Sequence, residues 1–229
     1  MRARRLLVLS SVLVISLIAS LALAAPRSPQ ISVSGTALAA FFASQGQAIN
    51  VSTDQLDLQT LSVAVGTAFE VHRFGSEASG TDVGAYNANG NKKTAPARYT
   101  MFPAATTPGW YVTGAYRSGP NRLVVNLFDA NKALQGTTTY NGANASNFSL
   151  FDSGPNGTYY LEDARNAGGA AKILAFAGTG TYSGWTWFAG ETSPGSGGDF
   201  ADVITLVNLG SSTTPVVSTT WGRLKAQYR

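Results

Sequence analysis

Short runs of β-branched and aromatic residues recur from residue 48 onward, separated by turn-forming residues. The runs cover residues 48–51, 61–65, 68–74, 99–102, 110–116, 122–128, 135–140, 148–151, 158–161, 171–176, 185–188 and 203–208. Glycine, proline and asparagine cluster between them, as in Gly-Pro-Asn-Gly at 154–157. Strands separated by turns at a spacing of roughly ten residues are typical of antiparallel sandwiches and barrels. The pattern predicts an all-β fold, an antiparallel β-sandwich with a jelly-roll-like arrangement.

One stretch before these runs has a helical composition. Alanine, leucine and phenylalanine fill residues 37–43, Thr36 stands where a helix N-cap is expected, and Gly46 follows the stretch. Threonine can cap free backbone amides, and glycine suits the left-handed residue that often ends a helix. The sequence therefore predicts one short N-terminal helix.

The chain divides into three parts by composition. Residues 1–24 combine Arg2, Arg4 and Arg5 with an apolar run that ends in Ala-Leu-Ala, and Ala25 follows, which is the pattern of a cleaved signal peptide. An uncleaved membrane anchor is the alternative.

Residues 25–209 contain no charged or proline-rich linker and are expected to form a single β-sandwich domain. Residues 210–229 form a Ser/Thr-rich linker and a short basic, aromatic tail. We expect a secreted protein, extracellular or on the cell surface, with the periplasm as the alternative.

The composition excludes several classes of protein. The 229 residues include no cysteine and one histidine, which excludes a disulfide scaffold, a thiolate zinc site and an HExxH protease. Removal of the signal peptide leaves 13 basic residues against 12 acidic ones. These basic residues are scattered, so we expect no nucleic-acid partner. After signal cleavage we also expect no transmembrane segment.

Three carboxylates lie around one glycine-rich loop near the C-terminus. Glu191 ends a predicted strand, and Asp199 and Asp202 precede the next one. Calcium binds six to eight oxygens, commonly from carboxylates and backbone carbonyls in loops of this kind. The spacing therefore indicates Ca²⁺ as a cofactor bound by Glu191, Asp199 and Asp202. The alternative is that the aspartates only accept hydrogen bonds from the turn.

This loop resembles that of a family of exported bacterial domains of unknown function. Members end in an FED segment, a glycine-rich stretch, DxDFND or DxDYND and a hydrophobic strand. Here Glu191 matches the glutamate, Asp199 and Asp202 match the last two aspartates, and Phe200 matches the aromatic residue between them. The resemblance implies a β-sandwich module of extracellular proteins that binds calcium.

The match departs from the family pattern at three positions. Thr192 replaces an aspartate, Gly197 replaces the first aspartate of DxD, and Ala201 replaces the asparagine. Each change removes an oxygen donor from the implied site. We therefore expect a weak or degenerate calcium loop.

Aromatic residues suggest where a ligand would bind. Nine tyrosines, four tryptophans and eleven phenylalanines lie in a chain with only 12% charged residues. Such surfaces bind sugars or peptides, although many of these rings belong to the core. Trp110, Tyr111, Trp185 and Trp187 are the predicted ligand-binding residues, and an extracellular glycan or peptide is the predicted partner.

An enzyme is the less favoured interpretation of the sequence. His72, two residues from Glu70 on a predicted strand, is a candidate general base. Glu162 and Glu191 are the candidate carboxylate pair of a glycoside hydrolase. No serine has glycine both two residues before and two residues after it, so the nucleophile elbow is absent. We expect a non-enzymatic interaction module, with a secreted glycoside hydrolase or a structural matrix component as alternatives.

Overall fold

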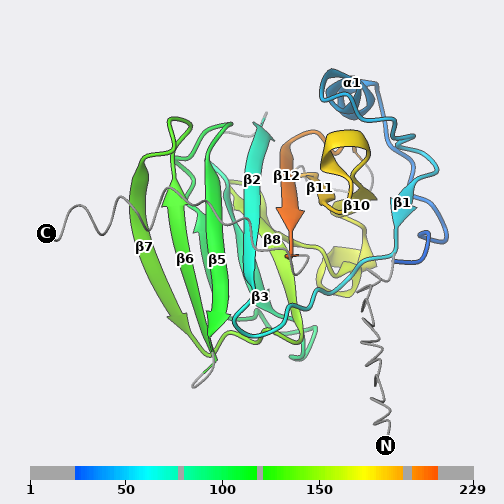
Figure 1. Cartoon of the computed structure of the whole chain (residues 1–229). Coiled ribbons are helices and arrows are strands. Elements are labelled where there is room, and N and C mark those ends of the chain that lie inside the picture. Colours follow the sequence, from blue (N-terminus) through cyan, green and yellow to red (C-terminus); the bar gives the residue numbers. More distant parts are fainter. Residues whose placement is uncertain (1–23, 77–79, 118–120, 193–197, 211–229) are drawn as a thin grey trace, which may run out of the picture.

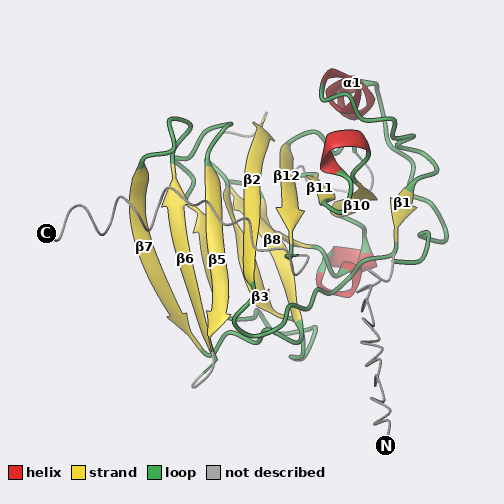
Figure 2. Ribbon diagram, viewed as in Figure 1, coloured by secondary structure: helices red, strands yellow, loops and turns green. Residues whose placement is uncertain are grey.

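The computed structural model describes residues 24–76, 80–117, 121–192 and 198–210 (Figure 1). These residues form twelve strands in two antiparallel sheets, one α-helix and three 3-10 helices (Figure 2). The predicted all-β sandwich with one short helix is confirmed. Apart from Ala24 and Gly210, the expected signal peptide and C-terminal tail lie outside the described residues.

The larger sheet has eight strands, and most neighbours in the sheet are also neighbours in the chain. In spatial order they are β1 (Gln55–Leu56), β10 (Ile173–Ala177), β11 (Thr186–Gly190), β12 (Val203–Asn208), β2 (Ala68–Ser76), β5 (Tyr111–Arg117), β6 (Arg122–Phe128) and β7 (Leu134–Asn141). Figure 1 looks onto the outer face of this sheet, with β7 at one edge and β1 at the other.

The smaller sheet lies behind it and has four strands. Their order is β4 (Arg98–Phe102), β3 (Asp82–Asn87), β8 (Phe148–Gly154) and β9 (Gly157–Tyr160). A jelly roll has eight strands in two Greek keys, whereas the described strands divide eight to four. The two sheets of the sandwich are therefore unequal in size, with four strands more than the eight of a jelly roll.

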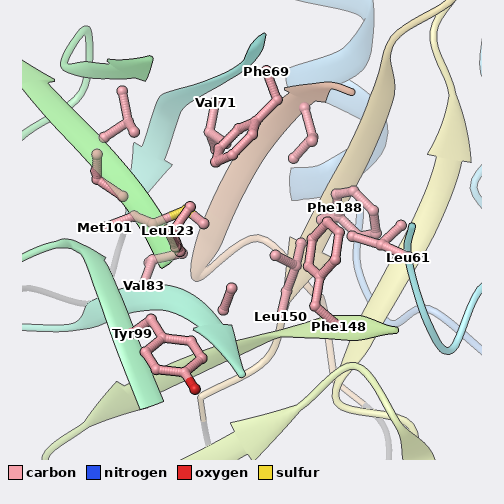
Figure 3. Packing of buried hydrophobic residues seen from close by; sticks show 14 of the residues in the cluster. Leu61, Phe69, Val71, Val83, Tyr99, Met101, Leu123, Phe148, Leu150 and Phe188 are labelled. Carbon is pink, nitrogen blue, oxygen red and sulfur yellow. The ribbon is translucent and has the colours of Figure 1, made fainter. Parts of the chain in front are cut away.

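The main core fills the space between the sheets. Alternate residues of each strand point to one face, so β2 contributes Phe69 and Val71 while β6 contributes Leu123. From the other sheet, Val83 and Leu150 point toward them (Figure 3). This apolar layer joins the two sheets.

A second core covers half of the outer face. The outward residues of β10, β11 and β12 are apolar and are buried against α1 (Ala37–Ser44) and nearby loops. The buried members are Leu38, Phe42, Ala171, Leu174, Phe176, Trp187, Ala189, Phe200, Ile204 and Leu206. This half of the molecule therefore has three layers, with α1 at one end of the sheet in Figure 1.

The helix forms where the sequence predicts it, but without the expected side-chain cap. Thr36 makes no capping hydrogen bond with its side chain, and Gly46 follows the helix with a φ of 67°. Packing of Leu38 and Phe42 in the second core stabilises a helix this short. The 3-10 helices are η1 (Asp163–Arg165), η2 (Ala167–Gly169) and η3 (Gly180–Tyr182). No helix in the part of the chain that the structure describes has the length and apolarity needed to cross a bilayer.

Two predicted strands are wrong. Residues 48–51 lead into a turn, in which Asp54 accepts a hydrogen bond from the Asn50 amide and Asn50 accepts one from the Ser52 amide. Residues 61–65 form only an isolated bridge, between Leu61 and Phe148. The side-chain hydrogen bonds of Asn50 and Asp54 offer the backbone of residues 48–51 an alternative to a sheet ladder.

Candidate functional site

The predicted calcium ligands Asp199 and Asp202 accept hydrogen bonds from their own loop. Asp202 Oδ2 accepts from both the backbone amide and the hydroxyl of Thr192, each at 2.7 Å. Asp199 Oδ1 accepts from the Ala201 amide at 3.0 Å. In this structure both aspartates stabilise the turn.

The third predicted ligand, Glu191, points into the protein. It is buried, and a side chain on Gly198 would overlap its Oε2 atom. Burial raises the pKa of Tyr159, and the nearby negative charge of Glu191 raises it further. The Glu191 carboxylate therefore lies against Gly198 and near β9.

Across residues 24–76, 80–117, 121–192 and 198–210, no three acidic or histidine side chains are grouped closely enough to hold a metal ion. Residues 193–197 of the loop lie outside the described part. Calcium binding by Glu191, Asp199 and Asp202 stays a prediction.

An ionisable pair that the sequence did not point to lies between the sheets. Asp152 on β8 is 5% exposed and Arg73 on β2 is 1% exposed. Burial raises the pKa of Asp152 to about 7, the charge of Asp202 adds to this, and Arg73 opposes it. Arg73 donates to the Thr106 hydroxyl at 2.7 Å. Beside Asp152 is a small cavity of about 10 Å³, close to the room that one water molecule needs.

Glu162, one of the two carboxylates proposed for hydrolysis, does not have the environment of a proton donor. Glu162 is buried, and it accepts hydrogen bonds from Tyr86 at 2.9 Å, Arg165 at 2.6 Å and Lys92. Burial opposes ionisation, but these three donors lower the pKa of Glu162 overall. A glycosidase acid needs a raised pKa and access to substrate, and Glu162 has neither.

The other half of the outer face of the large sheet lacks a covering layer among the described residues. We call the surface over β2, β5, β6 and β7 the open face. Apart from Ala115, which is small and buried, its outward residues are half-buried or exposed, whereas the outward apolar residues of β10 to β12 are buried. Two neighbouring rows of these side chains cross the strands.

The first row is aromatic, and we call it the aromatic ridge. It consists of Trp185, His72, Tyr111 and Phe128. The centroid of His72 lies 5.3 Å from that of Tyr111 and 5.4 Å from that of Trp185. Tyr111 and Phe128 are stacked at 4.8 Å with an interplanar angle of 6°. Leu134, paired with Phe128 on β7, continues the row and is 58% exposed.

The geometry of the ridge decides what it presents to solvent. Parallel rings on adjacent strands whose centroids are separated by only the strand spacing of roughly 4.8 Å cannot lie flat side by side on the sheet, because a ring is wider than this spacing. The rings of His72, Tyr111 and Phe128 therefore face one another, and their edges point outward. Trp185 is turned by 67° relative to His72 and closes one end of the stack.

The second row is polar and runs beside the ridge. It consists of Glu70, Thr113, Asn126 and Thr137, which are paired across four strands. Thr137 donates to Asn126 Oδ1 at 2.8 Å, and Asn126 Nδ2 lies 3.4 Å from the Thr113 hydroxyl. Glu70 Oε1 lies 2.5 Å from His72 Nε2 and so connects the two rows. The open face thus offers an apolar ridge with hydrogen-bonding groups beside it.

The four predicted aromatic residues divide between surface and core. Tyr111 and Trp185 lie on the ridge. Trp110 packs against the main core, because it neighbours Tyr111 in sequence and alternates to the opposite face. Trp187 is fully buried in the second core. Sequence reasoning missed Phe128, although the alternation in residues 122–128 places it on the outward side.

Comparison of the chain with protein-family models and with curated proteins found no match. The resemblance to exported calcium-binding domains therefore stays a prediction. The functional argument depends on the geometry of the open face.

Proposed function

We propose that this chain is a secreted β-sandwich interaction module and that its open face binds an extracellular polypeptide. The observation that carries the proposal is the aromatic ridge, which stays half-exposed on a sheet whose other half is covered by α1 and its loops. Exposed apolar patches rimmed by polar groups are typical of interaction sites. Export, which the N-terminal sequence pattern predicts, gives the face an extracellular partner.

The orientation of the rings favours a polypeptide over a glycan. Sugar rings pack their C–H faces onto the faces of aromatic rings, but Tyr111 is stacked on Phe128 on one side and on His72 on the other. A ridge of ring edges can instead contact aliphatic or aromatic side chains of a partner. The polar row beside it offers Glu70, Asn126 and Thr137 as hydrogen-bonding groups for a peptide backbone. The ligand-binding residues of the proposal are His72, Tyr111, Phe128 and Trp185.

Peptide and glycan arrays probed with the purified protein, with and without EDTA, test the proposal. We expect binding to a subset of peptides that persists in EDTA, because the ridge contains no calcium ligand. Tyr111→Ser combined with Phe128→Ser should weaken binding to the best array peptide at least about tenfold, the effect of losing one hot-spot contact.

The matched control is Val65→Ser, which removes an apolar side chain that is 54% exposed in the loop before β2. It should leave the affinity unchanged. Binding to glycans alone would contradict the polypeptide class. No binding on either array, or equal affinity of the ridge variant and the control, would contradict the proposal as a whole.

A further inference from the structure

Strand β7 ends the large sheet and has no strand beyond it in the described residues. It pairs with β6 along one side over Leu134–Asn141. All of its residues are exposed except Tyr140, which is half-buried. The outer side of the strand therefore presents backbone N–H and C=O groups that can pair with another chain.

The other sheet edges in the described structure are short or charged. β1 has two residues and β9 has four, while β4 has five and begins with the exposed Arg98. β7 has eight residues, with neither a charge nor a proline. Its one register irregularity lies beside Phe128, at the start of the strand, and leaves the pairing of Gly136–Asn141 regular. Natural proteins usually protect edges with lysine, proline, bulges or shortness, and most of β7 lacks these protections.

The sequence of β7 is complementary to its own reversed copy. A two-fold axis perpendicular to the sheet at Thr138 places Thr137 opposite Thr139 of the second copy. The same axis places Gly136 opposite Tyr140, and the regular part of β7 on the other side of the axis ends at Gly136. Residues directly opposite in an antiparallel pair lie on the same face, and the equal parity of each pair meets this condition.

Each of these pairings is favourable. Threonine pairs across strands stabilise a sheet. Gly136 places no side chain against Tyr140, whose ring packs on Tyr99 and whose hydroxyl donates to Thr100 O at 2.6 Å. No charge lies opposite a like charge. A partner of unrelated sequence would not require this symmetry, which favours a second copy as the occupant.

We propose that the chain forms a two-fold dimer through antiparallel pairing of β7 with β7, which joins two large sheets edge to edge. The dimer places two open faces on one continuous sheet surface. The inference is independent of the ligand that the open face binds, because it depends only on the edge of β7.

Charge placed on the two-fold axis gives a direct test. Thr138→Lys brings two lysines face to face, and Thr138→Glu brings two glutamates together. By analytical ultracentrifugation over a concentration series, we expect the unmodified protein to reach the dimer mass and each variant alone to stay monomeric. An equimolar mixture of the two variants should restore the dimer mass, because opposite charges then meet on the axis.

Two controls separate the interface from folding. Thr107→Lys makes the same change on an exposed loop residue before β5 and should leave dimerisation unchanged. Circular dichroism should show the same spectrum for all variants, since Thr138 is exposed. The proposal would be overturned if the unmodified protein were monomeric at every concentration. It would also be overturned if Thr138→Lys alone formed dimers with the dissociation constant of the unmodified protein.

The absence of cysteine allows a second test that reports the register. Thr138→Cys introduces the only thiol of the chain, and it lies opposite itself at a Cα separation of roughly 4.5–5.5 Å, which suits a disulfide. Mild oxidation should give a covalent dimer of Thr138→Cys rapidly, whereas Thr107→Cys should remain monomeric on a non-reducing gel. Equal rates of cross-linking for the two variants would contradict pairing at β7.

Discussion

The two halves of the outer face of the large sheet differ in what covers them. Strands β10, β11 and β12 are buried on both faces and have nearly continuous apolar sequences, such as Ile-Leu-Ala-Phe-Ala in β10. Strands β6 and β7 mix apolar residues with threonine and asparagine, and their outward residues stay partly or fully exposed. A continuous apolar run indicates a strand covered on both sides, and interrupted alternation indicates a strand with one side in water.

This comparison also separates stability from function. The second core buries large side chains and fixes α1 onto the sheet, so it contributes to the free energy of unfolding. The aromatic ridge leaves its rings half-exposed and contributes less. Changes in the two halves should therefore differ in size, and the predictions below test that difference from the largest effect to the smallest.

The largest effect is expected from Trp187→Ala. Trp187 is fully buried, and its ring makes edge contacts with Phe42 at 5.7 Å and Phe74 at 4.8 Å. The loss of a core tryptophan should lower the free energy of unfolding by about 3–5 kcal/mol, as measured by urea denaturation. Tyr111→Ala, on the ridge, should lower it by about 1 kcal/mol or less. Equal losses would mean that the two halves are covered alike.

A second prediction concerns the buried Asp152. Its pKa is raised to about 7 in the folded protein, above the ordinary value of 3.8. The folded state therefore binds the proton more tightly, and stability falls as the pH rises between these values. The fall amounts to at most about 4 kcal/mol by the conversion of 1.36 kcal/mol per pKa unit. Asp152→Asn should remove this dependence and should stabilise the protein most at pH 8.

The groups around Asp152 set the size of this effect. Arg73 favours the charged carboxylate and Asp202 disfavours it, while Asp82 acts on Arg73. Thermal unfolding of both proteins from pH 4 to pH 8 measures the difference. Asp57→Asn, which changes an exposed aspartate, is the control and should keep the slope of the unmodified protein. A slope that persists in Asp152→Asn would assign the pH dependence to other groups.

Paired glycine substitutions compare the interior of the large sheet with its free edge. A side chain on Gly114 of β5 would overlap the ring of Phe69, whereas one on Gly136 of β7 has open space around it. Gly114→Ala should destabilise by about 1–3 kcal/mol through overpacking. Gly136→Ala should stabilise by about 0.5 kcal/mol, because alanine restricts the unfolded chain. Urea denaturation of both variants at protein concentrations below those at which dimers form measures the effect on the single chain, and a destabilising Gly136→Ala under these conditions would contradict the open space around Gly136.

The strands could be predicted from sequence where turn residues bounded long runs of strand-forming residues. Residues 122–128 and 203–208 match β6 and β12 at both ends. β1 was missed because it has two residues and depends on pairing with the distant β10. The division of the strands into sheets of eight and four depends on tertiary packing, which no local pattern reports.

The candidate site was harder to predict because a residue pattern does not show what covers a face. Trp187 and Tyr111 both point to the outer side of the same sheet, but only Trp187 lies under the second core. Trp110 could have been excluded by its alternation with Tyr111. The acidic loop was visible in the sequence, yet the inward turn of Glu191 against Gly198 depends on the packing of both.

Calcium is expected to have a small effect on stability. A site with a dissociation constant of about 1 mM, weak as in many extracellular modules, would stabilise the folded state by about 1.4 kcal/mol at 10 mM Ca²⁺. We expect a rise in melting temperature that corresponds to no more than this free energy, because Asp202 already accepts two hydrogen bonds from Thr192. Differential scanning fluorimetry with Ca²⁺ and with Mg²⁺ measures the effect, and Asp202→Asn should remove any part of the rise that is specific to calcium. A large shift would show that cation binding rearranges the loop, and no shift at 10 mM would leave its carboxylates with the turn-stabilising role that their hydrogen bonds indicate.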